Sequence, residues 1–256
     1  MLKSELTDIW IMHHSVEDWS DRSVWRSYFE AAQDVVRSTL THLDAADPVR
    51  RKVESLDQAA SFVTTFPKGA ETRWLFGKFS KVGFRFTIHY YETSLVGRFL
   101  NSCNWYIPGS FIHERGGVEI INKLLELGAK SLGTFYSISD DIKYITQKKK
   151  QYGVKLEEEL LGIFWLNYFN EKYVDFFGME KLHQLGGVEF RPREGATLKL
   201  GQSPDEVPDG RREACERLLG YSSFVDPHDP RRKPVGQYVL SYAQLRDRDC
   251  GAEGEP

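Results

Sequence analysis

The sequence predicts an α+β fold in which a mixed, mainly antiparallel β-sheet packs against helices within a single domain. Segments whose apolar residues alternate with period two and segments with helical apolar periodicity follow each other along the 256 residues. Two alternating segments are neighbours and predict a hairpin, which disfavours a purely doubly wound parallel sheet. A hydrophobic content of 41% beside 28% charged residues is ordinary for a globular protein. We therefore expect one domain over residues 1–245 and a disordered tail at 246–256.

The N-terminal part of the chain predicts one strand and one long helix. Residues 7–12 include a short apolar run that favours a strand. Apolar residues then recur at spacings of three and four, which predicts a helix over about 23–43. Pro48 ends this pattern, because the residue before a proline avoids helical geometry. A mixed connection follows, with a short helix expected over 53–63.

The strongest strand signal is VGFRFTIHYYE at 82–92, where alternate residues are apolar. TRWLFGKF at 72–79 precedes it directly and is the expected hairpin partner. A further strand is expected at 101–106. It is followed by an amphipathic helix that ends at Gly128, since glycine commonly terminates helices. Residues 131–139 then predict another strand.

An acidic pair lies at the start of the next expected helix. Ser139 is the expected N-cap, Asp140 and Asp141 fall in the first turn, and three lysines at 148–150 fall in the last. Both clusters would complement the helix dipole. The pair could also serve acid–base catalysis, but dipole complementation accounts for it more simply.

LGIFWLNYFNEKYVDFFGMEKL at 161–182 is far richer in aromatic residues than the chain as a whole, whose aromatic content is 13%. We expect a buried strand at 163–167, then a helix capped by Asn170 and ended by Gly178. Strand and helix periodicities account for most of the rings, so the segment is expected to be core.

The C-terminal part predicts shorter elements joined by loops. A strand is expected at 196–201, a loop at 203–210 and a helix at 211–219. Residues 221–236 are loop-like, and a last strand is expected at 237–245.

Charge and targeting signals favour a soluble, cytoplasmic protein. A net charge of -3 gives little attraction to nucleic acid or membranes, so neither is an expected partner. No long apolar segment suits a signal peptide or a membrane span. Cys103, Cys215 and Cys250 are odd in number and widely spaced, which suits reduced thiols rather than a disulfide framework.

Motifs for known catalytic chemistry are missing from the sequence. It has no GxSxG nucleophile elbow and no GxxxxGK[ST] phosphate loop. Asp226 and His228 lie together in DPHDP, and His13 and His14 lie near Glu17, but neither group has a recognised ligand spacing. We expect no enzyme activity, no cofactor and no metal site. A metal-dependent hydrolase that combines His228 and Asp226 with a distant histidine remains an alternative.

The aromatic segment also carries a family resemblance. GIFWLNYFNEKYVDFFGMEKL is similar to the signature of the immunity protein 52 family of bacterial polymorphic toxin and type VI secretion systems. The residues that carry it are Gly162, Trp165, Asn167, Tyr168, Phe169, Tyr173, Val174 and the Phe-Phe-Gly at 176–178. The preceding hairpin, the GGVEIINKLL helix and the stretch from 186 to 204 fit the same layout, so the resemblance covers about 71–245.

The resemblance implies a non-catalytic inhibitor that binds a cognate secreted toxin and protects the producing cell. The toxin would be a restriction-endonuclease-like nuclease. The motif residues are then expected to be structural. An adaptor of the secretion apparatus is a second alternative.

Acidic and aromatic side chains are the candidate toxin contacts. Acidic clusters would complement the positively charged cleft of a nuclease, while buried aromatic anchors would supply affinity. Our candidates are Glu157, Glu158, Glu159, Asp205, Glu206, Asp209, Trp105 and Tyr106.

Overall fold

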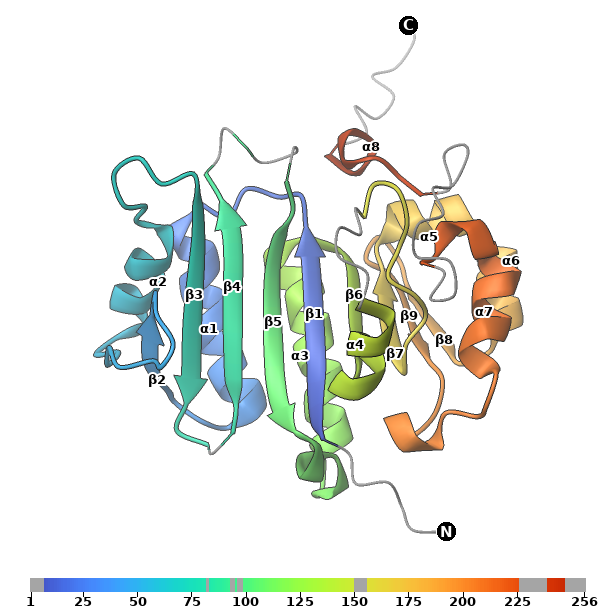
Figure 1. The fold of residues 1–256 in the computed structure, drawn as a ribbon, viewed down its shortest axis with the longest axis horizontal. Helices are drawn as coiled ribbons and strands as arrows, with labels where there is room; N and C mark the ends of the chain where they lie inside the picture. Colours follow the sequence, from blue (N-terminus) through green and yellow to red (C-terminus); the bar gives the residue numbers. More distant parts are fainter. Residues whose placement is uncertain are drawn as a thin grey trace, which may run out of the picture.

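The computed structural model describes residues 7–81, 83–92, 95, 99–149, 156–225 and 239–246. Within them, nine strands form one sheet in the order β2-β3-β4-β5-β1-β6-β7-β9-β8, with every neighbouring pair antiparallel (Figure 1). The strands are β1 (Asp8–Ser15), β2 (Leu40–Asp44), β3 (Thr72–Phe79), β4 (Arg85–Tyr91), β5 (Asn101–Pro108), β6 (Thr134–Asp141), β7 (Leu166–Phe169), β8 (Val188–Arg191) and β9 (Gly195–Lys199). The expected α+β class with a mainly antiparallel sheet is confirmed.

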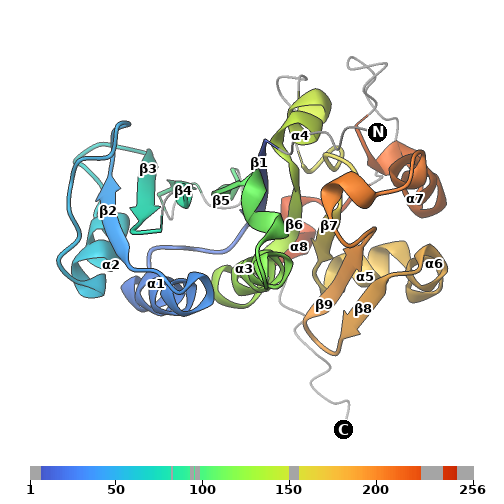
Figure 2. The ribbon, with the colours of Figure 1, turned by 90° about the horizontal axis from the view of Figure 1, so that it is seen from below.

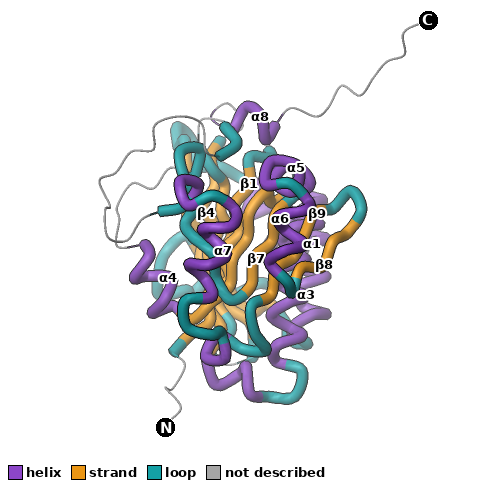
Figure 3. Tube along the Cα trace, turned by 90° about the vertical axis from the view of Figure 1, so that its right-hand side faces the viewer, coloured by secondary structure: helices purple, strands orange, loops and turns teal. Residues whose placement is uncertain are grey.

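Helices cover the two faces of the sheet unequally. One face carries α1 (Arg22–Val36), α2 (Leu56–Thr64) and α3 (Gly117–Leu132). On the other face, α4 (Ile142–Lys149), α5 (Glu171–Phe177), α6 (Met179–Leu185) and α7 (Arg211–Leu219) lie over the β6-β7-β9-β8 half (Figures 2 and 3). The short helix α8 (Tyr242–Arg246) lies at the end of the sheet where β1 finishes (Figure 1). Three 3-10 turns, η2 (Gly109–His113), η3 (Pro204–Glu206) and η4 (Tyr221–Ser223), complete the described elements.

None of the described helices is long and apolar enough to cross a membrane.

Aromatic side chains fill the layer between the sheet and α1. Trp25, Tyr28 and Phe29 of α1 are fully buried, and Phe29 lies 5.8 Å, ring to ring, from Phe86 of β4. Trp105 of β5 is also fully buried, and its Nε1 donates to the Tyr28 hydroxyl at 2.8 Å. Each ring donor in this layer therefore has a partner within the core, as buried indole groups require.

The first predicted helix ends earlier than expected. Arg37 adopts a left-handed conformation at φ 51 and terminates α1, and residues 40–44 form β2 instead of its last turns. The side chain of Gln33 holds this break by accepting from the Leu40 amide at 2.9 Å. Leu40 and Leu43 are both buried because the register of β2 shifts between Leu40 and His42. An irregular strand thus produces the three-residue spacing that predicted a helix.

Gly128 does not end its helix, contrary to the sequence-based expectation. It lies inside α3, which continues to Leu132 and ends at Gly133 in a left-handed conformation. A Cβ at Gly128 would lie 2.2 Å from Nδ1 of His13 on β1. The glycine is therefore needed for close packing of α3 on the central strand rather than for a helix stop.

The strand expected at 163–167 starts later, at Leu166. Side chains hold much of the backbone before it: Glu216 accepts from the Ile163 amide at 3.0 Å, and Asn167 bonds both backbone groups of Phe164 at 2.8 and 2.9 Å. The aromatic residues Phe164, Trp165 and Phe169 are fully buried, so the segment belongs to the core as expected. Asn170 caps α5 and Gly178 follows its last residue, as the sequence predicted.

The acidic pair does not lie in a helical first turn. Asp140 and Asp141 are the last residues of β6, and α4 begins at Ile142. Asp141 rather than Ser139 bonds the helix start, since its Oδ1 accepts from the Lys143 amide at 2.7 Å. Asp140 is buried against Arg212 of α7.

The C-terminal prediction also needs correction. Residues 242–246 form α8 rather than a strand, so Arg246 ends a helix instead of starting a tail. Elements α6 and β8 were not predicted, because both are short. The predicted loop from 226 onward, the strand start at 237–238, Lys150 and the tail from 247 lie outside the described residues.

Candidate partner-binding surface

Within the described residues, no helix covers one face of the sheet over β2, β3, β4 and β5 (Figure 2). The views from below and from the front show α1, α2 and α3 behind β2, β3, β4 and β5, with no described helix on the opposite face of these strands (Figures 1 and 2). Side chains alternate between the two faces of a strand. The register therefore places Trp74, Phe76, Thr87, His89 and Tyr106 on the uncovered face, while Leu75, Phe86 and Trp105 point to the helices.

Four rings form a strip across this face, which we call the aromatic strip: Trp74, His89, Tyr91 and Phe99. Trp74 stacks on His89 with ring centroids 4.0 Å apart and planes 12° apart. His89 lies 4.9 Å from Tyr91, which stacks on Phe99 at 4.7 Å. Trp74 and Phe99 are 50% and 45% exposed, which is unusual for rings of this size. The strip is therefore an exposed apolar surface that is ordered by its own ring contacts.

The strip carries no charge at neutral pH. Burial lowers the pKa of His89 to about 4, so its imidazole is neutral. Its Nε2 lies 2.8 Å from the hydroxyl of Thr72, which satisfies one ring nitrogen. A neutral, ring-lined surface loses little on desolvation when a partner covers it.

A second ring pair lies farther along the same face. Trp10 of β1 and Tyr106 of β5 are 5.3 Å apart, and Arg85 forms an exposed ion pair with Asp8 at 3.9 Å. A hollow of about 220 Å³ adjoins Tyr106 and Arg85. Tyr106, one of the predicted toxin contacts, therefore lies on the uncovered face.

One predicted acidic cluster acts electrostatically on Tyr242 of α8, as does Tyr91 of the aromatic strip. Tyr242 of α8 has a pKa raised first by burial and also by the charges of Glu157 and Glu158, and Tyr91 acts on it too. Tyr242 therefore lies within electrostatic range of both the carboxylates and the strip. Glu157 and Glu158 are exposed, and Glu159 is half-buried.

The other predicted residues lie elsewhere. Asp205, Glu206 and Asp209 are exposed in the connection between β9 and α7, which occupies the opposite end of the molecule from α8 (Figure 1). The Ser203 hydroxyl donates to Asp205 at 2.5 Å. Trp105 is wrong as a surface anchor, because it is fully buried behind the sheet.

The aromatic strip was not among the sequence-based predictions, although the sequence carries a signal for it. Trp74, His89 and Tyr91 occupy alternate, same-face positions of the predicted hairpin. Alternation showed that one face would be buried, but not that the other would stay uncovered.

The residues considered for metal binding have other roles or lie outside the described chain. His13 is fully buried with Nδ1 3.0 Å from the Ser137 hydroxyl, and His14 stacks on Tyr136 at 6.1 Å. No group of three or more potential ligands occurs among the described residues. Asp226 and His228 lie outside them.

The fold and this surface define an α+β protein with helices on both faces of its sheet, in which no described helix covers the β2-β3-β4-β5 part of one face. No protein-family model matches the chain, and no curated protein matches it in sequence. Among solved structures, the Pseudomonas aeruginosa T6SS protein PA0821 is similar, with a TM-score of 0.61 and 12% sequence identity over 94% of this chain and 81% of that chain. At this identity the likeness shows a shared fold and no more.

Proposed function

We propose that this protein is an immunity protein of a type VI secretion or polymorphic toxin system. It binds a cognate toxin, a restriction-endonuclease-like nuclease effector, inside the cytoplasm of the producing cell. The resemblance of residues 162–182 to the immunity protein 52 signature supports this proposal. The fold shared with a type VI secretion protein over 94% of the chain agrees with it.

The observation that carries the proposal is the uncovered sheet face with its aromatic strip. Protein interfaces are enriched in Tyr, Trp and Phe, and a few such residues usually supply most of the affinity. Trp74 and Phe99 are the most exposed rings of the strip. The side chains already contact each other, so binding would order few of them and cost little conformational entropy.

The acidic residues Glu157 and Glu158 indicate that the proposed partner is positively charged where it binds. Glu157 and Glu158 act electrostatically on Tyr242 of α8, and Tyr91 of the strip acts on the same side chain. A nuclease needs a positively charged cleft for its substrate, and such a cleft would be attracted to these carboxylates. In the proposed complex the strip supplies affinity, and the carboxylates speed association and block substrate entry. The protein acts by binding, without catalysis, and its partner is a protein rather than nucleic acid or a membrane.

A pull-down from the native bacterium tests the proposal. The tagged full-length protein is recovered under native conditions, and mass spectrometry identifies proteins present in near-equal amounts. We expect one effector with a nuclease-like domain, whose DNA cleavage stops when the purified protein is added. Recovery of secretion components alone would instead favour an adaptor. A recovered effector whose cleavage continues in the complex would contradict neutralisation.

A further inference from the structure

Basic side chains form a row across the uncovered face of the sheet. Lys52 lies opposite His42 of β2, and His42 lies opposite Lys78 of β3. Lys78 in turn lies opposite Arg85 of β4, and it shares the uncovered face with Phe76 two residues before it. We call Lys52, His42, Lys78 and Arg85 the basic row. It spans about 15 Å, because neighbouring strands lie about 4.8 Å apart.

The row lies at the opposite end of the strands from the aromatic strip. It crosses the sheet where β3 finishes and β4 begins (Figure 1). Trp74 and His89 of the strip pair nearer the other end of the same two strands. The uncovered face therefore has an aromatic end and a basic end.

The side chains of the row act on one another. The pKa of His42 is lowered first by burial and then by the charges of Lys78 and Lys52. Its imidazole is therefore mainly uncharged at neutral pH, and the cations of the row are Lys52, Lys78 and Arg85. Like charges on directly opposite residues, such as Lys78 and Arg85, destabilise a sheet. An anion bound across the row would offset this repulsion.

The two lysines of the row have no ionic partner among the described residues. Neither Lys52 nor Lys78 forms an ion pair there, although Asp47 and Glu54 flank Lys52 in the sequence. Asp44 lies beside the row, but its carboxylate accepts from the backbone amides of residues 45, 50 and 51 at 2.8, 3.1 and 3.1 Å. Both ammonium groups are therefore available to carboxylates of another molecule.

Arg85 has a weak partner and connects the row to the hollow described above. It pairs with Asp8 at 3.9 Å, but both side chains are largely exposed, and such pairs contribute little. The hollow of about 220 Å³ is lined by Arg85, Asp47 and the rings of Phe76 and Tyr106. This volume is below the roughly 300–1,000 Å³ of small-ligand sites, so it suits one side chain. Opposite charges line it, and an apolar side chain therefore fits better than a charged one.

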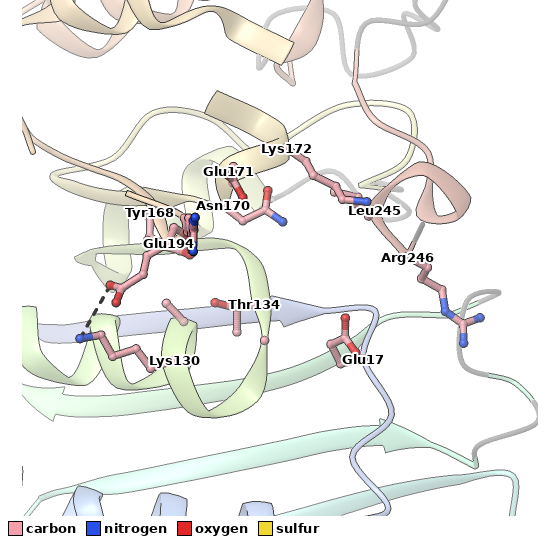
Figure 4. Close-up of a pocket in the computed structure, with 13 residues that line it drawn as sticks. Glu17, Lys130, Thr134, Tyr168, Asn170, Glu171, Lys172, Glu194, Leu245 and Arg246 are labelled. Atoms are coloured by element: carbon pink, nitrogen blue, oxygen red, sulfur yellow. Dashed lines mark hydrogen bonds and ion pairs between the residues drawn. The ribbon is translucent and has the colours of Figure 1, made fainter. Parts of the chain in front are cut away.

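A larger hollow elsewhere has no bias toward one charge. It holds about 590 Å³ where α3, α5, the β8–β9 turn and α8 meet (Figure 4). Lys130 and Glu194 form an ion pair there at 3.7 Å, and Glu171 and Lys172 also line it. Cations and carboxylates are mixed in this hollow, so its charges select no ligand.

We propose that the basic row and the hollow beside it bind an acidic segment of the partner protein. Carboxylates of the segment pair with Lys52 and Lys78, and an apolar side chain enters the hollow. The inference rests on the proposed function only in taking a protein as the occupant of this face. A nucleic acid fits less well, because the carboxylates around the row would repel a chain with a charge on every nucleotide.

Calorimetric titration of the full-length protein with short peptides tests the site. Acetyl-Glu-Glu-Leu-Glu-Glu-amide is expected to bind with a Kd of about 1 mM or below, and more weakly as the salt concentration rises. The analogue with glutamine in place of glutamate is expected to bind about tenfold more weakly. The analogue with glycine in place of leucine is expected to bind about threefold more weakly, because it leaves the hollow empty.

Equal binding of the glutamine analogue, or no saturable binding of the acidic peptide, would overturn the role of the row. Equal binding of the glycine analogue would overturn the role of the hollow. Tighter binding of an oligothymidylate would overturn the choice of a protein segment. Since the probe is a peptide rather than the toxin, these results can contradict the site while the pull-down still recovers an effector.

Substitution in the row separates binding from structure. Lys78→Gln is expected to weaken binding of the acidic peptide about fivefold while leaving the melting temperature unchanged or higher, because it removes repulsion by Arg85. Adding Lys52→Gln should weaken binding further. Lys181→Gln removes an exposed lysine on α6 and should change neither property. A lower melting temperature with unchanged affinity in Lys78→Gln would show that the row is structural.

Discussion

Arg212 Nη2 of α7 lies 2.8 Å from Asp140 Oδ2 at the end of β6, and the same carboxylate oxygen accepts from the Trp165 amide at 2.8 Å. The Asp140 side chain is 1% exposed, and the guanidinium carbon of Arg212 lies 4.1 Å from the centre of the Tyr144 ring. This buried ion pair therefore connects α7, α4 and the aromatic segment at 161–182 to the sheet.

Removing one partner of this pair should be strongly destabilising. Arg212→Met leaves the Asp140 carboxylate buried without its counter-charge, which costs about 3–5 kcal/mol in comparable cases. Urea unfolding monitored by tryptophan fluorescence measures the change. The exposed pair Lys123–Glu119 is the control, and Lys123→Ala should have a much smaller effect because solvent screens the pair. Equal effects of the two substitutions would mean that the buried pair contributes no more than a surface one.

Alanine at position 128 should destabilise the protein although alanine favours helices. Gly128→Ala gains about 1 kcal/mol in helix propensity, but its Cβ would lie 2.2 Å from the His13 ring and force α3 away from β1. Overpacking of this kind costs about 1–3 kcal/mol beyond that gain. Thermal unfolding provides the measurement, with Ser131→Ala in the same helix as control. In the His13→Ala background, Gly128→Ala should become less harmful. The steric explanation fails if it does not.

Stability should fall with pH below neutrality because of His13. Burial lowers its pKa to about 3, whereas the unfolded chain has the ordinary value near 6.5. Between these values the unfolded state binds one more proton than the folded state, so this group's contribution is complete above about 6.5 and is lost as the pH falls. The slope reaches about 1.4 kcal/mol per pH unit.

His13→Asn should reduce this slope between pH 6.5 and 4, as measured by urea unfolding at each pH. His89, whose pKa is lowered to about 4, adds a slope in the same direction over the narrower window between about 4 and 6.5. His113→Asn at an exposed position serves as control. An unchanged slope in His13→Asn would mean that His13 is protonated in the folded state.

Trp74→Ala should weaken binding of the proposed toxin. Loss of a central aromatic anchor typically costs about 2 kcal/mol or more, which is roughly 30-fold in Kd. Met179→Ala is the matched control, because Met179 is 51% exposed on α6, away from the aromatic strip, while Trp74 is 50% exposed. Surface plasmon resonance with the recovered effector compares the two. The strip is not the interface if both variants bind like the natural chain.

Charge reversal at Glu157 and Glu158 should mainly slow association, whereas Trp74→Ala should mainly speed dissociation. Reversal at Asp205 and Glu206, which lie at the other end of the molecule, should alter neither rate.

Local sequence patterns predicted most elements, and tertiary contacts account for the failures. Alternation was sufficient for β3 and β4, because each has one buried face. The spacing of Leu40 and Leu43 led to a wrong helix prediction, because an irregular strand and a helix can share a three-residue spacing. Gly128 looked like a helix stop because the His13 ring that requires it lies far away in sequence.

The candidate surface was only partly accessible to sequence reasoning. Tyr106 and the cluster at Glu157 could be selected by residue type, but Trp105 differs from its neighbour only in the face of β5 to which it points. Which face remains uncovered depends on where α4, α5, α6 and α7 pack, and no local pattern encodes that placement.

The position of β1 has a consequence for how the chain is made. This strand is synthesised before the other strands of the sheet, yet it lies in the middle, where Asp8 pairs with Pro108 on one side and Ile9 with Asp141 on the other. During translation β1 cannot form both of its strand pairs until β5 and β6 have left the ribosome. Because such distant pairings are slow to form, the two halves of the sheet should join late. A nascent chain stalled before α3 would expose β1, and a chaperone that binds extended apolar segments should recognise it there.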